Sequence, residues 1–588
     1  MPYIPRTPEK KLNQINTYYQ MSKNARSDFE TGNRNWNRLY RYYMTNPLSN
    51  VVYKNNIFVP KSFEVVETWL PIVFGTPPKL RIKRVKNGDY PAAQRQKALM
   101  EYYIRMGNHK SVMKDFIRQA GIFGTSWLKT FWRYETKKRV KRIITQDVDG
   151  SRILKGVEVD DIVADYPSME VLSVYDVYPD PNARDYWSMD WVIERKLVTR
   201  QTLEEMLEID GFKLPRGVKL DNIKGYASAL EDKPNTDKAG ANYETYYEDR
   251  YLITEFWGAD GELIIALNNA HIIYDGGNFF DHQQIPYIPF RVNRPPLEFY
   301  GLGLLIPIMS LQEELNALRS QRRDNIDLAM NTMFTVKETS PLAGTDIVFK
   351  PGAVLEVQDQ DDIRQLQFHD VTQVAVQEAG MVEIDIKRAI GISEYIEGQV
   401  VPGMNKTATG VMAMQNMALS RIQEHIDTLE TEVISVLAEH FAALMKQNFN
   451  TEEVITVVDE TNTAQEDIQV TPEDIMVDVD YEAESGSTSP VNKEMRIQNA
   501  ITTFQIVTMP QITQALNMEG KDINYEFFIN NILDAIGIKN KDRAIKPLSQ
   551  AKGQLLAAQM ADEYIGKGGV LPGEGGGGET PPQGGVIG

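Results

Sequence analysis

Three stretches of the chain carry apolar side chains at the spacing of an amphipathic helix. The first covers residues 301–330, where a 4-3-4-3 spacing places five apolar residues on one stripe of a single predicted helix. These residues are Leu304, Ile308, Leu311, Leu315 and Leu318. Arg322 takes the next place on the stripe, and Arg323 can reach Asp327 one turn further on. The pattern predicts a helix that begins packed against protein and ends polar, as it leaves a compact body.

The second and third stretches repeat this pattern. Residues 371–390 carry the stripe Ala375, Ala379, Val382, Ile386 and Ala389, and Gly391 suits the position just after a helix. The third predicted helix covers residues 409–449, and its stripe consists of Ile422, Ile426, Leu429, Val433, Val436, His440 and Leu444. At about 1.5 Å per residue it spans roughly 60 Å, which is more than a compact domain needs.

Two shorter segments separate the three helices. Residues 332–369 predict a small β unit with strands at Met333–Lys337, Ile347–Phe349 and Val354–Val357. Residues 393–406 contain Pro402-Gly403 and predict a loop.

Residues 50–300, which precede the first helix, predict a mixed α+β body. Lys79–Val85 alternates basic and apolar residues, as an edge strand does. A strand at Ser126–Tyr134 is followed by a hairpin of Val140–Ile144 with Ile153–Val159, turning at Asp149-Gly150. The predicted fold class is therefore α+β.

The two ends of the chain differ from its middle. Residues 7–45 predict helices whose aromatic residues have the spacing of a core or a subunit contact rather than of a base-stacking platform. Residues 451–485 predict acidic strands, and residues 491–565 predict further helices. The last 23 residues, 566–588, contain 11 Gly and 3 Pro and predict a disordered tail.

The net charge of −18 is unevenly distributed. Residues 1–142 hold 28 Lys and Arg against 9 Asp and Glu, a balance of +19, so the remainder carries −37. Residues 451–490 hold 12 acidic residues and no basic one. Either the opposite regions meet within or between subunits, or the basic third contacts nucleic acid or an acidic partner.

The sequence offers little to support an enzyme. It has no cysteine, which excludes disulfides, cysteine nucleophiles and thiolate metal sites. The segment Gly398–Thr407 resembles a phosphate loop, but Met404 and Asn405 separate Gly403 from Lys406 and no strand precedes it. No two of the six histidines have metal-ligand spacing. His440 on the third stripe is expected in the core, whereas His425 off the stripe is expected in solvent or at a subunit contact.

The chain also lacks the signals of a membrane or secreted protein. Its first residues have no apolar segment like that of a signal peptide, and no uncharged apolar run approaches the ~18 residues of a membrane helix. We therefore expect a soluble, cytosolic protein where it is made.

The order of the predicted elements resembles that of the portal (head–tail connector) proteins of tailed bacteriophages. Five stretches are similar to this family in detail: Asn56-Ile-Phe-Val-Pro-Lys-Ser-Phe-Glu-Val-Val-Glu67, Tyr178-Pro-Asp-Pro-Asn-Ala-Arg184, Gln312-Glu-Glu-Leu-Asn316 with Arg319-Ser-Gln-Arg-Arg-Asp-Asn325, Ala408-Thr-Gly410, and Ser485–Ser489 before Lys493-Glu-Met-Arg496. The resemblance covers roughly residues 50–540. None of these stretches is a catalytic motif, so its specificity comes from their joint order.

The resemblance implies a division of the chain into parts. These are a wing (1–300), two stem helices (301–331 and 370–392), a clip (332–369), a tunnel loop (393–406), a long wing and tunnel helix (407–450), acidic wing strands (451–490), a C-terminal helical crown (491–565) and the tail (566–588).

It also implies a function without catalysis or cofactors. Portals form a ring, usually of twelve subunits, at one capsid vertex, through which double-stranded DNA is packaged and ejected. The partners implied are the terminase large subunit, which hydrolyses ATP, then a head–tail adaptor, and the major capsid and scaffolding proteins. The implied location is the virion, with assembly in the host cytoplasm and no membrane.

Two sets of site residues follow from the resemblance. The channel-facing tunnel loop contains Gln399, Val400, Val401, Met404, Asn405 and Lys406. The stem and subunit interface contains Arg319, Arg322, Arg323, Asp327, Glu383 and Lys387. Two alternatives stay open: a non-channel adaptor or scaffold, and a nucleic-acid-processing enzyme, which would need an intact phosphate loop or a clustered acid and histidine site.

Overall fold

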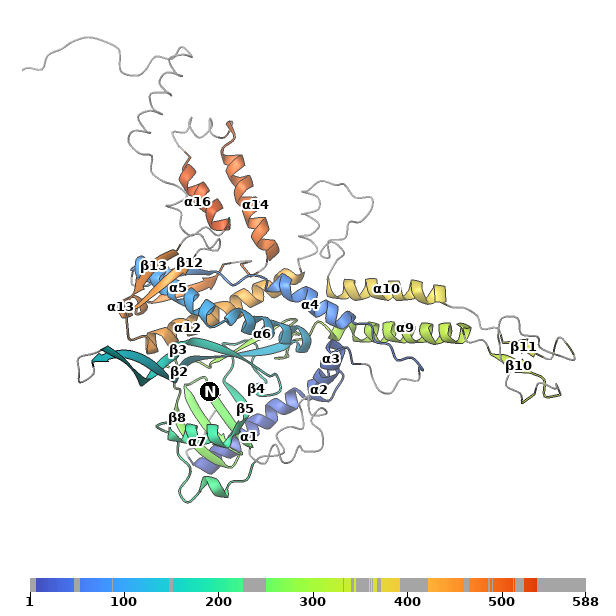
Figure 1. The fold of residues 1–588 in the computed structure, drawn as a ribbon, viewed down its shortest axis with the longest axis horizontal. Coiled ribbons are helices and arrows are strands. Elements are labelled where there is room, and N and C mark those ends of the chain that lie inside the picture. The colour runs from blue at the N-terminus through green and yellow to red at the C-terminus, as the bar shows by residue number, and fades with distance from the viewer. Residues whose placement is uncertain are drawn as a thin grey trace, which may run out of the picture. The chain divides into compact units, whose positions relative to one another are not determined.

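The computed structural model describes residues 7–46, 53–225, 250–330, 333–391, 421–458 and 465–536, apart from short gaps at 87, 147–151, 340–342, 345–358, 360, 362, 367–371, 485–486, 489, 511 and 513–522. The chain forms two compact units: residues 1–457 with 467–495, and residues 458–466 with 496–588. Helices and strands are mixed along the first unit, which confirms the α+β class (Figure 1).

The first unit contains most of the regular elements. Its helices are α1 (Pro8–Ala25), α2 (Ser27–Glu30), α3 (Trp36–Tyr43), α4 (Lys61–Val73), α5 (Tyr90–Met106), α6 (His109–Phe123), α7 (Arg200–Glu208), α9 (Met309–Met330), α10 (Thr372–Ile390), α12 (Ser435–Asn448) and α13 (Pro472–Ile475). Short 3-10 turns cover Leu220–Asn222 and Ile306–Ile308. Its strands are β1 (Leu80–Val85), β2 (Thr125–Gln146), β3 (Arg152–Leu172), β4 (Val177–Pro179), β5 (Trp191–Thr199), β6 (Arg250–Gly258), β7 (Glu262–Leu267), β8 (His271–Gly277), β9 (Tyr287–Arg291), β10 (Phe334–Val336), β11 (Ile363–Gln365) and β14 (Val479–Ala483).

Four further elements lie near the C-terminal end of the described chain. The strands β12 (Glu453–Val458) and β13 (Gln465–Val470) form a two-stranded sheet. The helix α14 covers Pro490–Val507. In the second unit, α16 covers Tyr525–Ile536. The helices predicted over 491–565 are thus confirmed as far as the structure describes them.

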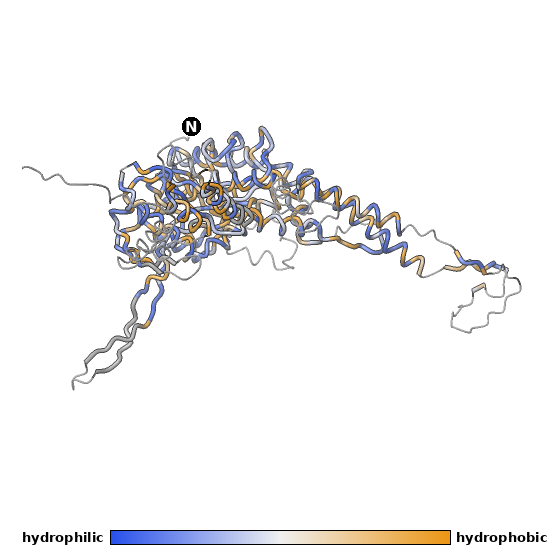
Figure 2. Tube along the Cα trace, turned by 90° about the horizontal axis from the view of Figure 1, so that it is seen from above, coloured by the Kyte–Doolittle hydropathy of each residue, from blue (hydrophilic) through white to orange (hydrophobic). Residues whose placement is uncertain are grey.

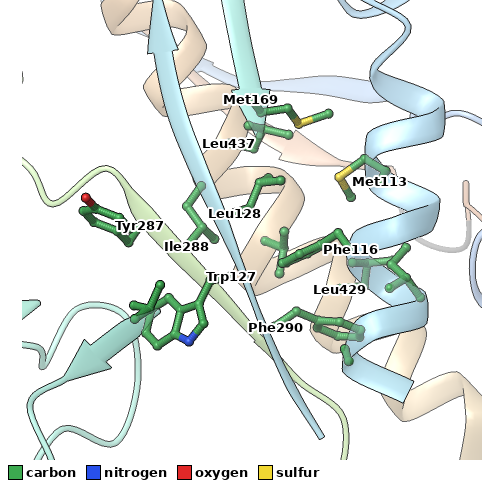
Figure 3. Close-up of a cluster of buried hydrophobic side chains, with 14 of the residues drawn as sticks. Met113, Phe116, Trp127, Leu128, Met169, Tyr287, Ile288, Phe290, Leu429 and Leu437 are labelled. Atoms are coloured by element: carbon green, nitrogen blue, oxygen red, sulfur yellow. The ribbon is translucent and has the colours of Figure 1, made fainter. Parts of the chain in front are cut away.

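The core of the body lies between the antiparallel sheet β3-β2-β9 and two helices (Figure 3). Leu128 and Ile288 are register partners on β2 and β9, and both are fully buried. Phe116 on α6 and Leu437 on α12 belong to the same hydrophobic cluster. Because side chains alternate along a strand, Trp127 points to the opposite side of the sheet.

On that opposite side, β2 contacts the second sheet, β4-β5-β6-β7-β8, through a buried cluster of charged side chains. Lys129 on β2 places its Nζ 2.5 Å from Glu194 and 2.9 Å from Glu255, and the Tyr287 hydroxyl donates to Glu194 at 2.6 Å. Burial opposes the charge of Lys129, but the two carboxylates outweigh it and raise the pKa of the ammonium. Removing one member of such a buried group costs about 3–5 kcal/mol, because it leaves an uncompensated charge.

The N-terminal helices pack on this body through their aromatic residues, as the sequence predicts. Trp36, Leu39 and Tyr42 on α3 are each at most 1% exposed. Arg26, also fully buried, donates to the carbonyl oxygens of Val174, Tyr175 and Val177 and lies over the Tyr178 ring at 3.7 Å. These aromatics are core residues rather than a stacking platform.

The basic and acidic regions of the chain meet in a small sheet. Strand β1, which is basic, pairs antiparallel with the acidic strand β14 from Leu80–Ala483 to Val85–Val479. Lys83 lies 3.8 Å from Glu482, Lys86 lies 3.5 Å from Asp480, and Arg95 lies 2.5 Å from Asp474. Part of the charge imbalance along the sequence is therefore compensated within the subunit.

Two predicted elements have different limits in the structure. The strand and the separate hairpin expected between 126 and 159 are one continuous hairpin of β2 with β3, with a register shift after Glu135. The helix expected from residue 301 begins at Met309, because Gly301 and Gly303 lie against the backbone of Gly124 and Ile122. A β-carbon at Gly301 would come within 2.4 Å of the Gly124 carbonyl oxygen, so this close approach requires glycine.

The long third helix is described from residue 421 to 448, and every residue of its predicted stripe is buried. It contains a π-helical turn at Leu429–Ile434, which the sequence pattern does not predict. The turn brings the buried carboxylate of Glu430 to Thr488, whose backbone N–H and hydroxyl both donate to Oε1 at 3.1 and 3.0 Å.

Three histidines are buried and His282 is half-buried, and one of the buried three was expected in solvent or at a subunit contact. His440 lies 2.9 Å from Thr130 Oγ1 and 2.8 Å from the Tyr186 hydroxyl, as expected of a core residue. His425 is only 8% exposed, because its Nδ1 accepts from Trp69 Nε1 at 3.2 Å and its Nε2 lies 3.2 Å from Asn293 Oδ1. Burial lowers the pKa of His440 to about 3, and that of His109, His282 and His425 to about 4.

These histidines predict a loss of stability as the pH falls from 6.5 to about 4. The unfolded chain binds protons from the ordinary pKa of 6.5 downward, whereas the folded protein does so only below the lowered values. Unfolding is therefore favoured by about 1.4 kcal/mol per pH unit for each histidine. Thermal unfolding scans at about pH 7 and about pH 5 measure this slope.

The variant His440→Gln should reduce that slope by about a quarter, since one of four groups is lost. His271→Gln, at a half-buried position at the start of β8, is the control variant. Equal melting temperatures at the two pH values in the unaltered protein would contradict the prediction.

Candidate functional site: the α9–α10 hairpin

Helices α9 and α10 lie side by side, and the strand pair β10–β11 joins their far ends (Figure 1). In the strand pair, Phe334 is the register partner of Gln365 and Val336 that of Ile363. The sequence predicts the first of these strands but not the second. The strands predicted at Ile347–Phe349 and Val354–Val357 lie outside the described residues.

The two helices pack through the predicted stripes. On α9, Leu315 is 2% exposed, and Leu311 and Leu318 are half-buried against the same core. On α10, Val382 and Ile386 are 4% and 1% exposed. Gly391 adopts a φ of 81° and donates its N–H to Lys387 O at 3.0 Å, which confirms it as the residue that ends the helix.

A polar ladder on the other side of α9 holds the segment 54–62. It consists of Gln312, Asn316, Ser320 and Asp324, each four residues from the next. Their side-chain oxygens accept backbone N–H groups of that segment: Ser62 at 3.0 Å, Val59 at 2.9 Å, Ile57 at 3.0 Å and Asn55 at 3.0 Å, in the order of the ladder. The amide of Gln312 also donates to Val59 O at 2.8 Å.

The spacing of the ladder matches the geometry of the segment that it holds. Every second residue of an extended chain advances about 6.6 Å, while every fourth residue of a helix advances about 6 Å. Residues 55, 57 and 59 can therefore meet 324, 320 and 316 in turn, and the two chains run in opposite directions. The ladder accepts hydrogen bonds from backbone N–H groups that have no partner in a β-sheet. It therefore fixes α9 to the body.

The sequence does not predict this contact, although both partner segments carry the resemblance to a known family. Asn56–Glu67 and Gln312–Asn325 appear among the stretches that resemble the portal family. The signal was present, because polar residues recur at 312, 316, 320 and 324 along one side of a helix whose other side is apolar. A stripe of short polar side chains at that spacing indicates a side of the helix that binds another segment, rather than a side that only faces solvent.

Helix α10 is fixed at its end near the body. Lys61 on α4 places its Nζ 3.4 Å from Glu383 and 2.8 Å from Glu64. Arg421, at the start of the described long helix, donates to Arg388 O at 3.4 Å. Both α9 and α10 are thus attached to the body by polar contacts as well as by their apolar stripes.

The structure distributes the predicted interface residues over both helices. Arg323 pairs with Asp327 at 3.1 Å, as expected from their spacing, and Asp327 also accepts from Asn55 Nδ2 at 2.8 Å. Arg319 is exposed, while Arg322 and Lys387 are half-buried. Asp327 and Glu383 are therefore engaged within the subunit. The six predicted tunnel-loop residues, Gln399, Val400, Val401, Met404, Asn405 and Lys406, lie outside the described residues.

The outer side of α10 carries exposed apolar residues. Val374, Met381 and Ile384 are 68%, 53% and 42% exposed and lie at i, i+7 and i+10, on one side of the helix. Hydrophobic positions recur along both helices as far as their ends (Figure 2). Apolar side chains that a subunit leaves uncovered at this spacing are typical of an interface.

Among the described residues we find neither a metal-binding cluster nor a membrane-spanning helix. Within them, no group of three or more histidine or acidic side chains lies close enough to hold a metal ion. None of the described helices is long and apolar enough to cross a bilayer.

The comparison with known families agrees with this arrangement. Residues 144–563 match the phage SU10 portal protein family, a range that contains α9, α10, the strand pair between them and the long helix. The chain thus belongs to the portal proteins of tailed phages, and within them to the phage SU10 portal protein family. No curated protein matches the chain. The match confirms the resemblance inferred from the sequence. Proteins of this family are structural and build an oligomeric ring in the capsid.

The ladder predicts a local loss of protection when its acceptors are removed. Gln312→Ala or Asn316→Ala leaves a backbone N–H of the 54–62 segment unsatisfied, which should cost about 1–3 kcal/mol each. Hydrogen exchange at Val59 and Ser62 should accelerate in these variants. Glu314→Ala, at an exposed position of the same helix, is the control. Unchanged exchange at Val59 in Asn316→Ala would contradict the assignment of the ladder.

Proposed function

We propose that the chain assembles into a ring-shaped channel at one capsid vertex, through which double-stranded DNA is packaged and ejected. The observation that carries this proposal is the α9–α10 hairpin of a portal-family chain, which exposes Val374, Met381 and Ile384 on one side of α10. Helices repeated around a ring can cover such a side, whereas one subunit alone leaves it in water.

The proposed parts follow the described elements. Residues 1–300 with the acidic strands at 451–490 form the wing. The stem consists of α9 and α10, and the clip of residues 332–369 around β10 and β11. Residues 393–406 form the tunnel loop, the long helix follows it, and the helices of 491–565 form the crown.

The charge of the chain suits a channel for DNA. A channel that moves a polyanion must not bind it tightly, and a subunit with a net charge of −18 does not attract it overall. Three basic residues, Lys83, Lys86 and Arg95, support this view, because they already pair with acidic residues between 474 and 482. Within the tunnel loop, we propose that Gln399, Val400, Val401, Met404, Asn405 and Lys406 face the DNA.

The subunit interface is proposed along the stem. It combines the exposed side of α10 with Arg319, Arg322, Arg323, Asp327, Glu383 and Lys387. Asp327 and Glu383 contribute with the part of each carboxylate that Asn55 and Lys61 do not occupy.

The partners and the location are proposed from the family. The clip docks the terminase large subunit, which hydrolyses the ATP, and later a head–tail adaptor. The outer wing meets the major capsid and scaffolding proteins. The ring, which we expect to contain twelve subunits, assembles in the host cytoplasm and stays in the virion. The chain itself performs no catalysis and binds no cofactor.

Electron microscopy of the purified full-length protein tests the channel. We expect rings with a central hole wide enough for duplex DNA, and no ATP hydrolysis by the protein alone. Monomers or open filaments would overturn the channel and favour an adaptor or scaffold. ATP hydrolysis by the pure protein would favour an enzyme instead.

The proposed interface predicts that a charge on the exposed side of α10 prevents assembly. Met381→Asp would bury an unpaired carboxylate at every subunit contact, so the fraction of protein in rings should fall about tenfold or more. Arg322→Glu should likewise weaken assembly more than subunit folding. Native mass spectrometry measures the ring fraction, and circular dichroism follows the fold. Gln373→Asp adds the same charge at an exposed polar position of α10 and is the control. Parallel losses of assembly and folding would return these residues to an ordinary core role.

A further inference from the structure

The outer part of the β2–β3 hairpin has two open edges. Strand β9 pairs with β2 only from Thr125 to Lys129, and β3 is the edge strand of the sheet along its whole length. Beyond the register shift at Glu135–Thr136, the two strands pair with each other as far as Gln146 and Arg152. In the part of the chain that the structure describes, no further strand pairs with this ribbon. Its edges therefore present backbone groups to solvent or to a partner.

The two strands of this ribbon carry charges of opposite sign. Residues 133–142 of β2 hold six basic residues and one acidic residue, whereas residues 158–165 of β3 hold four acidic residues and no basic one. Lys137, Lys138 and Asp160 are exposed, and they lie on adjacent register positions (Lys137–Asp161 and Lys138–Asp160). The β2 strand of the ribbon is thus basic, whereas the β3 strand is acidic between residues 158 and 165 and carries two basic residues, Arg152 and Lys155, nearer the turn.

Contacts inside the hairpin use only part of this charge. Arg139 pairs with Asp161 at 3.1 Å, and Arg133 pairs with Glu135 on its own strand at 2.8 Å. Apolar side chains are also uncovered here: Tyr134, Val140 and Ile162 are 61%, 65% and 54% exposed. An isolated two-stranded ribbon is barely stable in water, so a ribbon of this length gains from a neighbour.

We propose that the ribbon of one subunit lies edge to edge with the ribbon of the next subunit, with the basic β2 edge against the acidic β3 edge. A second copy of this chain is therefore the partner, and the inference rests on the proposed ring. A two-fold contact would place β2 on β2 or β3 on β3, which brings like charges together. A head-to-tail contact instead places opposite charges together at every step and leaves no open edge once the ring closes.

The separation of charge between the two strands indicates more than protection of the edges against aggregation. Charged side chains keep an edge strand from aggregating, but either sign serves that purpose, and a mixture serves it equally well. Sorting basic residues onto one strand and acidic residues onto its partner makes the two edges complementary to each other. Strand β3 of one copy would then run antiparallel to β2 of the next, as in the hairpin itself.

The test uses two variants with like charges on both strands. The acidic variant is Lys137→Glu with Lys138→Glu, and the basic variant is Asp160→Lys with Asp161→Lys. Each alone should form rings at least about tenfold less well than the unaltered protein, measured by native mass spectrometry. Mixed in equal amounts, they should regain rings in which the two variants alternate, because every contact then pairs an acidic edge with a basic one.

The mixture separates the proposed contact from effects inside one hairpin. Each chain in the mixture still has two like-charged strands, so repair of its own hairpin cannot explain recovered rings. Lys110→Glu with Lys114→Glu makes the same charge change at exposed positions of α6 and is the control, which should assemble normally.

The outcomes distinguish this inference from the proposed channel. If the unaltered protein forms no ring, the channel proposal itself fails. If the unaltered protein forms rings and either variant alone forms them equally well, the ribbon contact is overturned while the channel stands. Failure of the mixture to assemble also overturns it.

A cross-linking measurement avoids charge reversal altogether. The chain has no cysteine, so Lys138→Cys in one preparation and Asp160→Cys in another can form a mixed disulfide only between different subunits. We expect cross-linked dimers when the two preparations are mixed before assembly, and much less when they are mixed after it. Equal cross-linking in both orders would count against the contact.

Discussion

The attachment of α9 to the body depends on backbone N–H groups that need a hydrogen-bond acceptor. The segment 54–62 lies on a helix rather than beside a strand, so its donors cannot be satisfied by a sheet. The oxygens of Gln312, Asn316, Ser320 and Asp324 replace that sheet, at a spacing that an extended chain can follow. The apolar stripe on the other side of α9 is then available for α10. Helix α9 thus contacts both the body and α10, because one of its sides is polar and the other is apolar.

In the body, too, apolar packing and polar contacts lie on opposite sides of one element. Leu128 and its neighbours pack on α6 and α12, while Lys129, next in the chain, enters a cluster with Glu194 and Glu255. In this cluster the buried ammonium is matched by carboxylates and a hydroxyl group. His440 between Thr130 and Tyr186, and Arg26 beneath three carbonyl oxygens, likewise have polar partners.

The sequence predicts the elements of this protein better than their contacts. The stripes on α9, α10 and the long helix, the α+β class and the end of α10 at Gly391 follow from local periodicity and backbone preference. The start of α9 does not, because it depends on Gly301 meeting the backbone of Gly124, far away in the sequence. The burial of His425 depends in the same way on Trp69 and Asn293. The ladder was visible as a spacing, but its partner could be identified only in three dimensions.

The π-helical turn at Leu429–Ile434 affects how the length of the chain can vary. Such a turn holds one residue more than an α-helical turn, and losing that residue leaves both flanks of the helix in their original orientation. Losing a residue elsewhere between 421 and 448 would instead rotate all following side chains by about 100°. Related chains can therefore differ by one residue at this turn and keep the same packing around His440 and Phe441.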